Sequence, residues 1–205
     1  MLPSIVLADP QGPSHHDILT RAQAQTLLGL TPKTVSTLLA SRFLPDLRAS
    51  RVHALSRTRR IIVTSGRLPV LRTGAAGPPP EDYDRREFLG DGAGLSDRQF
   101  LEASRRWWRC DANAVVSAGL LAVAVGGWVT GVLAVRGVER SWRHGSGQVR
   151  YAFDAEVAGR VGVLDDPATF RVLSADPALS ALTGQLLGCR VQGAASGGHI
   201  TCLTG

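Results

Sequence analysis

The clearest pattern of apolar and polar positions lies between residues 19 and 45, in the segment LTRAQAQTLLGLTPKTVSTLLASRFLP. Its apolar residues recur every three or four positions, which places them on one face of each of two short helices. We expect the first helix at residues 21–28, with Gly29 behind it in the left-handed conformation that ends many helices. Pro32 opens a second helix, with its body at residues 33–41. The pattern therefore predicts two helices joined by a tight turn.

The outward face of the second helix carries short polar and basic side chains. They are Lys33, Thr34, Ser36 and Thr37. Side chains of this kind suit a helix that enters the major groove of duplex DNA, where they reach base edges and phosphates. We therefore expect these four residues to carry any preference for DNA sequence.

The residues after Pro45 predict a small wing and a third helix. Residues 47–48 and 51–55 can pair as two short strands, and Ser56 can cap a helix at residues 57–65. Four arginines accompany these elements and are candidate contacts to DNA phosphates: Arg42, Arg48, Arg51 and Arg57.

Over roughly residues 17–66, this order of elements resembles the winged helix-turn-helix of the excisionase-like and MerR-like regulators. The resemblance rests on the string LLGLTPKTVSTLLASRFLP, then a basic wing, then a helix that starts at a serine. It implies a sequence-specific double-stranded DNA-binding protein, either a transcriptional regulator or an excisionase-like factor. The alternative for this segment is a helical hairpin that only packs against the rest of the chain, since such shapes also occur in proteins that bind no DNA.

The distribution of charge agrees with a DNA-binding N-terminal segment. The whole chain carries a formal charge of +6, but the first 75 residues hold ten basic and three acidic residues, so that segment carries +7 and the remainder −1. A positive field confined to one segment suits phosphate binding, because neutralised phosphates release condensed counterions. The competing interpretation is an arginine-rich surface that is simply solvated.

The composition divides the chain into two domains and a linker. The string TGAAGPPP at residues 73–80 interrupts every periodic pattern. We expect a winged helix-turn-helix domain at residues 1–72, a linker at 73–94 and a small α+β domain with a β-hairpin core at 95–205. The expected elements around and after the linker are a strand at 68–71, a helix at 96–109, a strand at 149–153, a helix at 155–162, a helix from 177 toward 187, and strands at 190–191 and 199–203.

The uncharged segment at residues 112–135 allows two interpretations. It is long enough to span a bilayer as a helix and has basic residues on both sides. However, Gly126-Gly127 separates two alternating runs rich in valine, which favours a β-hairpin with a two-residue turn. We expect the buried hairpin and no membrane. The alternative is a membrane-anchored protein with residues 112–135 as a transmembrane helix.

The candidate chemistry is sparse. Lys33 is the single lysine, which excludes a phosphate-binding loop that ends in Lys-Ser or Lys-Thr and a Schiff-base lysine in the C-terminal half. Three widely spaced cysteines and the N-terminal string MLPSIVLADP indicate neither a disulfide framework nor a signal peptide, so we expect a cytoplasmic protein. The possible metal ligands are Cys110, His144, Cys189, His199 and Cys202. Only His199 and Cys202 lie close together in the sequence. We therefore expect no metal, no cofactor and no enzymatic activity.

The same features predict self-association. A single winged helix reads only a few base pairs directly, too few to find one site in a genome, so a second copy is expected. The N-terminal segment has no heptad helix long enough for a coiled coil. We therefore expect a homodimer through the C-terminal domain.

Overall fold

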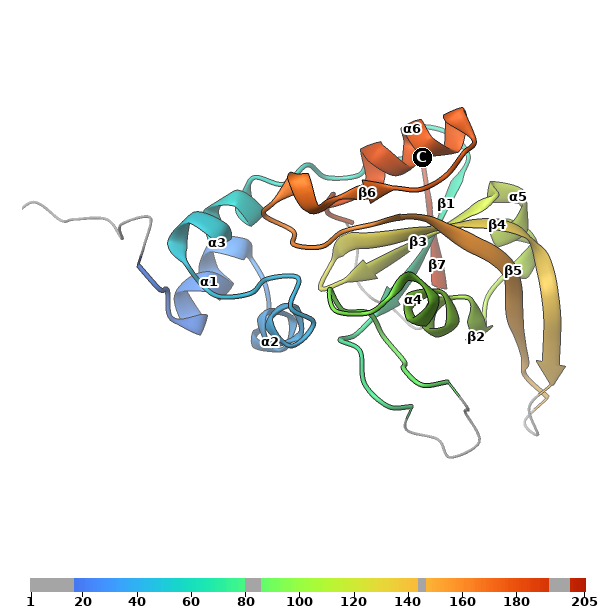
Figure 1. Cartoon of the computed structure of the whole chain (residues 1–205), viewed down its shortest axis with the longest axis horizontal. Helices are drawn as coiled ribbons and strands as arrows, with labels where there is room; N and C mark the ends of the chain where they lie inside the picture. The colour runs from blue at the N-terminus through green and yellow to red at the C-terminus, as the bar shows by residue number, and fades with distance from the viewer. Residues whose placement is uncertain (1–16, 80–85, 144–146, 192–199) are drawn as a thin grey trace, which may run out of the picture.

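The computed structural model describes residues 17–79, 86–143, 147–191 and 200–205, which form a mixed α+β fold around a curled sheet (Figure 1). The helices in these residues are α1 (Arg21–Leu28), α2 (Pro32–Ala40), α3 (Ala49–Ser56), α4 (Asp97–Ser104), α5 (Ala112–Ala118) and α6 (Pro177–Leu186), with a 3-10 turn η1 at Pro167–Thr169. The strands are β1 (Arg67–Thr73), β2 (Arg106–Trp108), β3 (Leu120–Val125), β4 (Trp128–Arg143), β5 (Val149–Arg160), β6 (Arg171–Val172) and β7 (Ile200–Thr204). The expected α+β class is confirmed.

The seven strands form one sheet in the order β2-β5-β4-β3-β1-β7, with β6 also paired to β5. Strands β1 and β3 run parallel, and the other pairs are antiparallel. The three N-terminal helices lie at one end of this sheet, and the joined ends of β4 and β5 extend from the other (Figure 1). The two ends of the molecule therefore carry different elements.

The uncharged segment at residues 112–135 folds as α5 followed by the β3–β4 hairpin, so the expected hairpin is confirmed. Gly126 and Gly127 have φ values of 60° and 95°, the positive angles that a two-residue turn requires. Every residue of β3 is buried, because both faces of the sheet are covered. The uncharged hydrophobic run in this segment thus indicates a strand in the centre of the sheet. Among the described residues, no helix combines the length and apolar composition needed to cross a bilayer.

Two hydrophobic cores lie on the two faces of the sheet. Along β3, Ala122 and Ala124 belong to the core that also contains apolar residues of α1, α2 and α3. Leu121 and Val123 alternate with them and belong to a second core with residues of α4 and α5. The N-terminal helices therefore pack on the sheet within a shared core, and β1 joins them to it by pairing with β3 and β7. The division into domains at residues 73–94 remains a prediction.

The predicted wing is wrong. Residues 51–55 belong to α3, and the only backbone bridge beside them joins Ile18 to Arg48 within the part of the chain that the structure describes. The physical reason is the spacing of Ala49, Val52 and Leu55, which are all buried and recur at the three-residue interval of a helix.

Two further helices expected from the sequence are absent, although the structure describes their residues. Residues 57–65 form an extended connection, because Ile61 and Val63 pack against the core while Ile62 is 77% exposed, an alternation of period two. Residues 155–160 continue β5, since β4 supplies backbone partners for most of its length. Cross-strand pairing therefore decides the conformation of these residues.

Candidate nucleic-acid interface

The α1–α2 pair forms as the sequence predicts. The hydroxyl of Thr20 accepts a hydrogen bond from the backbone N–H of Gln23 at 3.3 Å, and the Gln23 side chain accepts one from the N–H of Thr20 at 2.8 Å. This capping box fixes the start of α1. Gly29 then ends the helix at φ 60° and ψ 46°, the left-handed conformation that glycine adopts at little cost.

Helix α2 is held by its cap and by its buried face. The Thr31 hydroxyl accepts a hydrogen bond from the Thr34 N–H at 3.3 Å, and Pro32 occupies the first turn. Val35 and Leu38 are completely buried in the core beneath the helix. These contacts fix the rotation of α2 about its axis, and so they decide which of its polar side chains reach the surface.

The four expected base-contacting residues lie on the outer part of α2, but not equally far out. Lys33 is exposed, whereas Thr34, Ser36 and Thr37 are half-buried. The Thr37 hydroxyl donates to the Lys33 carbonyl at 3.0 Å, and the hydroxyls of Thr34 and Thr31 lie 2.9 Å apart. Two of the three hydroxyls are therefore held close to the helix, and Lys33 reaches furthest.

The four expected phosphate-contacting arginines fall into two groups. Arg42 and Arg57 are exposed and form no ion pair within the described residues. Arg48 is exposed but lies 3.4 Å from a carboxylate oxygen of Asp46. One terminal nitrogen of the Arg51 guanidinium donates to both carboxylate oxygens of Asp165 at 2.8 Å, and this ion pair ties α3 to the turn before η1. The partners of Arg51 give it a structural role.

A cleft of roughly 500 Å³ runs beside α2, which we call the α2 cleft. Residues of α2 and the preceding turn form one wall: Leu30, Lys33, Thr34 and Thr37. The end of β1, the β3–β4 hairpin and the segment after α6 form the other wall: Arg72, Thr73, Gly74, Ala124, Gly126, Gly127, Arg190 and Val191. The polar face of α2 is thus partly turned toward the sheet rather than wholly toward solvent.

The α2 cleft is lined by three cations and by no acidic residue of the described chain: Lys33, Arg72 and Arg190. One terminal nitrogen of Arg190 donates to the Leu28 carbonyl at 3.0 Å, and its guanidinium lies 4.9 Å from the ring centroid of Trp128. Desolvation lowers the pKa of both Arg72 and Arg190, and the charge of Arg60 lowers that of Arg190 further. Both remain cations at neutral pH, so an anion in the cleft would meet positive charge.

Two more arginines lie next to this cleft. The N–H of Arg190 donates to the Arg59 carbonyl at 2.7 Å, and the N–H of Ile61 donates to the Arg190 carbonyl at 2.9 Å. This pairing brings the exposed residues Arg59 and Arg60 beside Arg190. The sequence reasoning did not select these two as site residues, although the run RTRR could have indicated them. It also missed Arg72 and Arg190, for which no local pattern exists because only the folded sheet brings them to α2.

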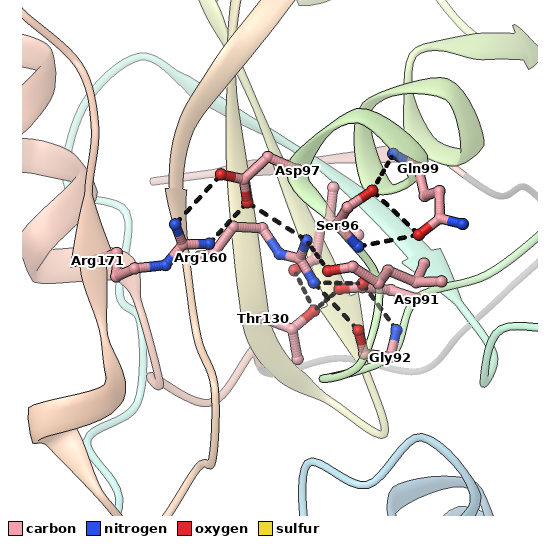
Figure 2. Close-up of polar contacts among 10 residues, drawn as sticks. Asp91, Gly92, Ser96, Asp97, Gln99, Thr130, Arg160 and Arg171 are labelled. Carbon is pink, nitrogen blue, oxygen red and sulfur yellow. Dashed lines mark hydrogen bonds and ion pairs between the residues drawn. The ribbon is translucent and has the colours of Figure 1, made fainter.

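A buried ion pair holds the loop between β1 and α4 against the sheet (Figure 2). The Asp91 carboxylate accepts from Arg160 at 3.1 Å, from the Thr130 hydroxyl at 2.7 Å and from the Gly92 N–H at 2.7 Å. Burial raises the pKa of Asp91, and the charge of Arg160 and the two other donors act in the opposite direction. Arg160 also lies 4.2 Å from the ring centroid of Phe100. This network is structural and lies outside the lining of the α2 cleft.

The cysteines give no sign of a metal site. All three are free, and burial raises the pKa of each thiol, that of Cys110 to about 12. No group of three potential ligands occurs among the described residues. His144 and His199, the two histidines considered as ligands from the sequence, lie outside the described residues.

No protein family, characterised protein or solved structure matches this chain.

Proposed function

We propose that the chain is a sequence-specific double-stranded DNA-binding protein that acts as a transcriptional regulator or as an excisionase-like factor. One observation carries the proposal. Five basic side chains on and after α2 and α3 are exposed and form no ion pair within the described residues: Lys33, Arg42, Arg57, Arg59 and Arg60. A surface of uncompensated cations beside a capped helix with short polar side chains is what duplex DNA requires.

The lining of the α2 cleft separates the residues proposed to contact base edges from those proposed to contact a phosphate. Ser36 lies outside the lining of the cleft and Lys33 is exposed, so these two are proposed to contact base edges in the major groove. Thr34 and Thr37 line the cleft with Arg72 and Arg190, so they are proposed to hold a backbone phosphate there. In this proposal the duplex lies over the exposed side of α2, and one of its backbones enters the α2 cleft.

The proposal includes assembly and location. One copy of α2 reads few base pairs, so a homodimer that presents two copies is proposed, assembled through the C-terminal half. Sedimentation of the full chain, alone and on its selected duplex, measures this stoichiometry. We further propose that the protein acts in the cytoplasm, where its cysteines stay reduced, and that its role is binding rather than catalysis.

Selection of duplexes from a random pool by the full-length protein tests the proposal. We expect selected sequences with affinity that falls by roughly 10³ between about 50 and 200 mM salt if about six phosphates are neutralised. Lys33→Ala and Ser36→Ala should change which sequences are selected, at about 1–3 kcal/mol per base contact. Arg57→Gln, Arg59→Gln and Arg60→Gln together should weaken all sequences alike and lower the salt slope by roughly 2 to 3.

Arg171→Gln is the matched control, because Arg171 is exposed but paired with Asp97 at 2.7 Å. It should leave both selection and salt slope unchanged. Absence of duplex binding at low salt would refute the proposal. An equal loss from the control variant would show that the effect is only one of net charge.

A further inference from the structure

The joined ends of β4 and β5 extend past the end of β3 (Figure 1), and β5 is paired there on its other side with β2 at Tyr151 and Ala152. Strand β3 pairs with β4 only as far as Ala134, whereas β4 continues to Arg143. From there β5 is the only strand paired with β4 in the described chain. We call residues 136–143 and 149–155 the distal ribbon. Packing in the hydrophobic core does not account for the length of the distal ribbon, because most of residues 136–143 are exposed.

Charge on the distal ribbon is compensated at its base and uncompensated at its tip. Near the base, Arg136 pairs with Glu156, and Glu139 pairs with Arg105. Beyond these pairs the ribbon carries three arginines that form no ion pair within the described residues: Arg140, Arg143 and Arg150. The acidic residue left on this part of the ribbon is Asp154, which lies opposite Gly137 and therefore nearer the base. The tip is consequently cationic.

An aromatic pair accompanies these cations. Trp142 is 39% exposed, and its ring centroid lies 6.5 Å from that of Trp107 with the planes at 69°. The neighbour Trp108 behaves differently, because it is 3% exposed and its indole N–H donates to the Ser104 carbonyl at 2.6 Å. Of these two adjacent tryptophans, Trp108 is thus buried, and the Trp107 ring contacts Trp142 of the distal ribbon.

The strand register brings the cations and the outer tryptophan to one face. Arg140 lies opposite Ala152, and Trp142 lies opposite Arg150. Residues two apart on a strand share a face, and so do directly paired residues. Arg140, Trp142 and Arg150 therefore project from the same side of the distal ribbon, with a small alanine as the fourth position. An indole flanked by guanidinium groups offers both a stacking surface and phosphate contacts.

We propose that this face of the distal ribbon binds single-stranded nucleic acid. A base stacks on Trp142, and the neighbouring phosphates contact Arg140 and Arg150, while Arg143 projects from the opposite face. Single strands are favoured over duplex because bases in a duplex are already stacked and cannot accept an indole, whereas unpaired bases can. A second copy of this chain is disfavoured at the open edge of β4, because like charges on both ribbons would repel. This site is separate from the surface proposed for duplex DNA.

Binding of a fluorescein-labelled oligothymidine to the full-length protein, followed by anisotropy, tests the proposal. Trp142→Ala should weaken binding about tenfold or more, and Trp142→Phe should retain most of it because a stacking ring remains. Arg140→Gln and Arg150→Gln together should lower the salt slope by roughly 1 to 1.5, the value for two phosphates on a single strand. Arg136→Gln, whose charge Glu156 already compensates, is the matched control and should change the slope little. Thermal unfolding checks that each variant is folded.

The two proposed surfaces are distinguishable in the same assay. The Arg57, Arg59 and Arg60 triple variant should bind oligothymidine as the unchanged protein does, even where it has lost duplex binding. Oligothymidine that does not bind, or that binds the Trp142→Ala variant and the Arg140 and Arg150 double variant as tightly as the unchanged protein, would overturn the proposal. Loss of oligothymidine binding only in the Arg57, Arg59 and Arg60 variant would also overturn it, because the single strand would then occupy the surface beside α2.

Discussion

Arg42 has a backbone conformation that few residues of its kind adopt. It follows the C-cap of α2 with φ 61°, in the left-handed region. That conformation costs an L-residue with a β-carbon roughly 1–2 kcal/mol, and glycine pays almost none of it. The turn is nevertheless useful to the fold, because it directs Phe43 and Leu44 completely into the core while the Arg42 side chain stays exposed.

Arg42→Gly should therefore separate stability from DNA affinity. Removing the β-carbon should raise the free energy of unfolding by about 1 kcal/mol, at an unchanged dependence on urea concentration. Removing the cation should at the same time weaken duplex binding. Arg42→Ala is the control, since it loses the charge but keeps the strain, and it should weaken binding without the gain in stability. Equal stability of the two variants would show that the left-handed backbone stores no strain.

At the scale of elements, the β3–β4 hairpin and α2 meet at a point that tolerates no added atom. A β-carbon on Gly126 would lie 2.7 Å from a methyl carbon of Leu38, and φ at this glycine is 60°. The contact fixes how close α2 stands to the sheet, and it therefore sets the width of the α2 cleft. A glycine in the turn was predictable from the hairpin alone, but its contact with a helix nearly ninety positions away was not.

Gly126→Ala should lower the free energy of unfolding by about 1–3 kcal/mol, from overpacking together with the left-handed backbone. Leu38→Ala should relieve part of that loss, so the double variant should be more stable than the sum of the two single changes, as urea denaturation would measure. Gly137→Ala is the control within β4, because a β-carbon there meets nothing within 4 Å and φ is not positive. Strict additivity of Gly126→Ala and Leu38→Ala would exclude the steric contact.

The sequence predicted those elements whose signals are local. Helix α1 has a cap and a terminal glycine within ten residues, α6 has Asp176-Pro177 at its start, and the hairpin has its glycine pair. The sequence did not predict elements whose conformation depends on residues distant in the chain. Strand β5 is such an element, because its residues 155–160 pair with β4. The same limit applies to the candidate site. Lys33 stood out on a helical face, whereas Arg190 reaches α2 only because the segment after α6 pairs with Arg59.

At the scale of the whole molecule, the Asp91–Arg160 pair joins the loop before α4 to the strands of the sheet. Asp91 is completely buried and the Arg160 side chain is 3% exposed, so neither charge has water to replace a lost partner. Arg160 also donates to the carbonyls of Gly92 and Leu95, which holds the start of the α4 segment (Figure 2). The loop around Gly92 in turn contacts the end of α2, because the Ala93 N–H donates to the Ser41 carbonyl at 2.9 Å.

Asp91→Asn should lower the free energy of unfolding by about 3–5 kcal/mol, because the buried Arg160 cation then keeps only the partly exposed Asp97 carboxylate, 3.8 Å away, as a counter-charge. Asp91→Leu combined with Arg160→Met should cost less than Asp91→Asn, since no buried charge is then left unpaired. The exposed pair between Arg171 and Asp97 is the control, and Arg171→Gln should cost less than about 1 kcal/mol. Urea denaturation measures all three. A loss from Asp91→Asn as small as the control's would mean that water reaches Arg160 in solution.

The residues that line the α2 cleft lie far apart in the sequence, so a chain that is being synthesised completes the cleft late. Helix α2 is synthesised before the wall opposite it, which includes Gly126-Gly127 and then Arg190-Val191. The strand β7 that completes the sheet beside β1 comes later still, at Ile200–Thr204. A nascent or truncated chain that stops before residue 190 thus has the helix pair without the finished cleft. Its proposed phosphate site is formed only when nearly the whole of this chain has been synthesised.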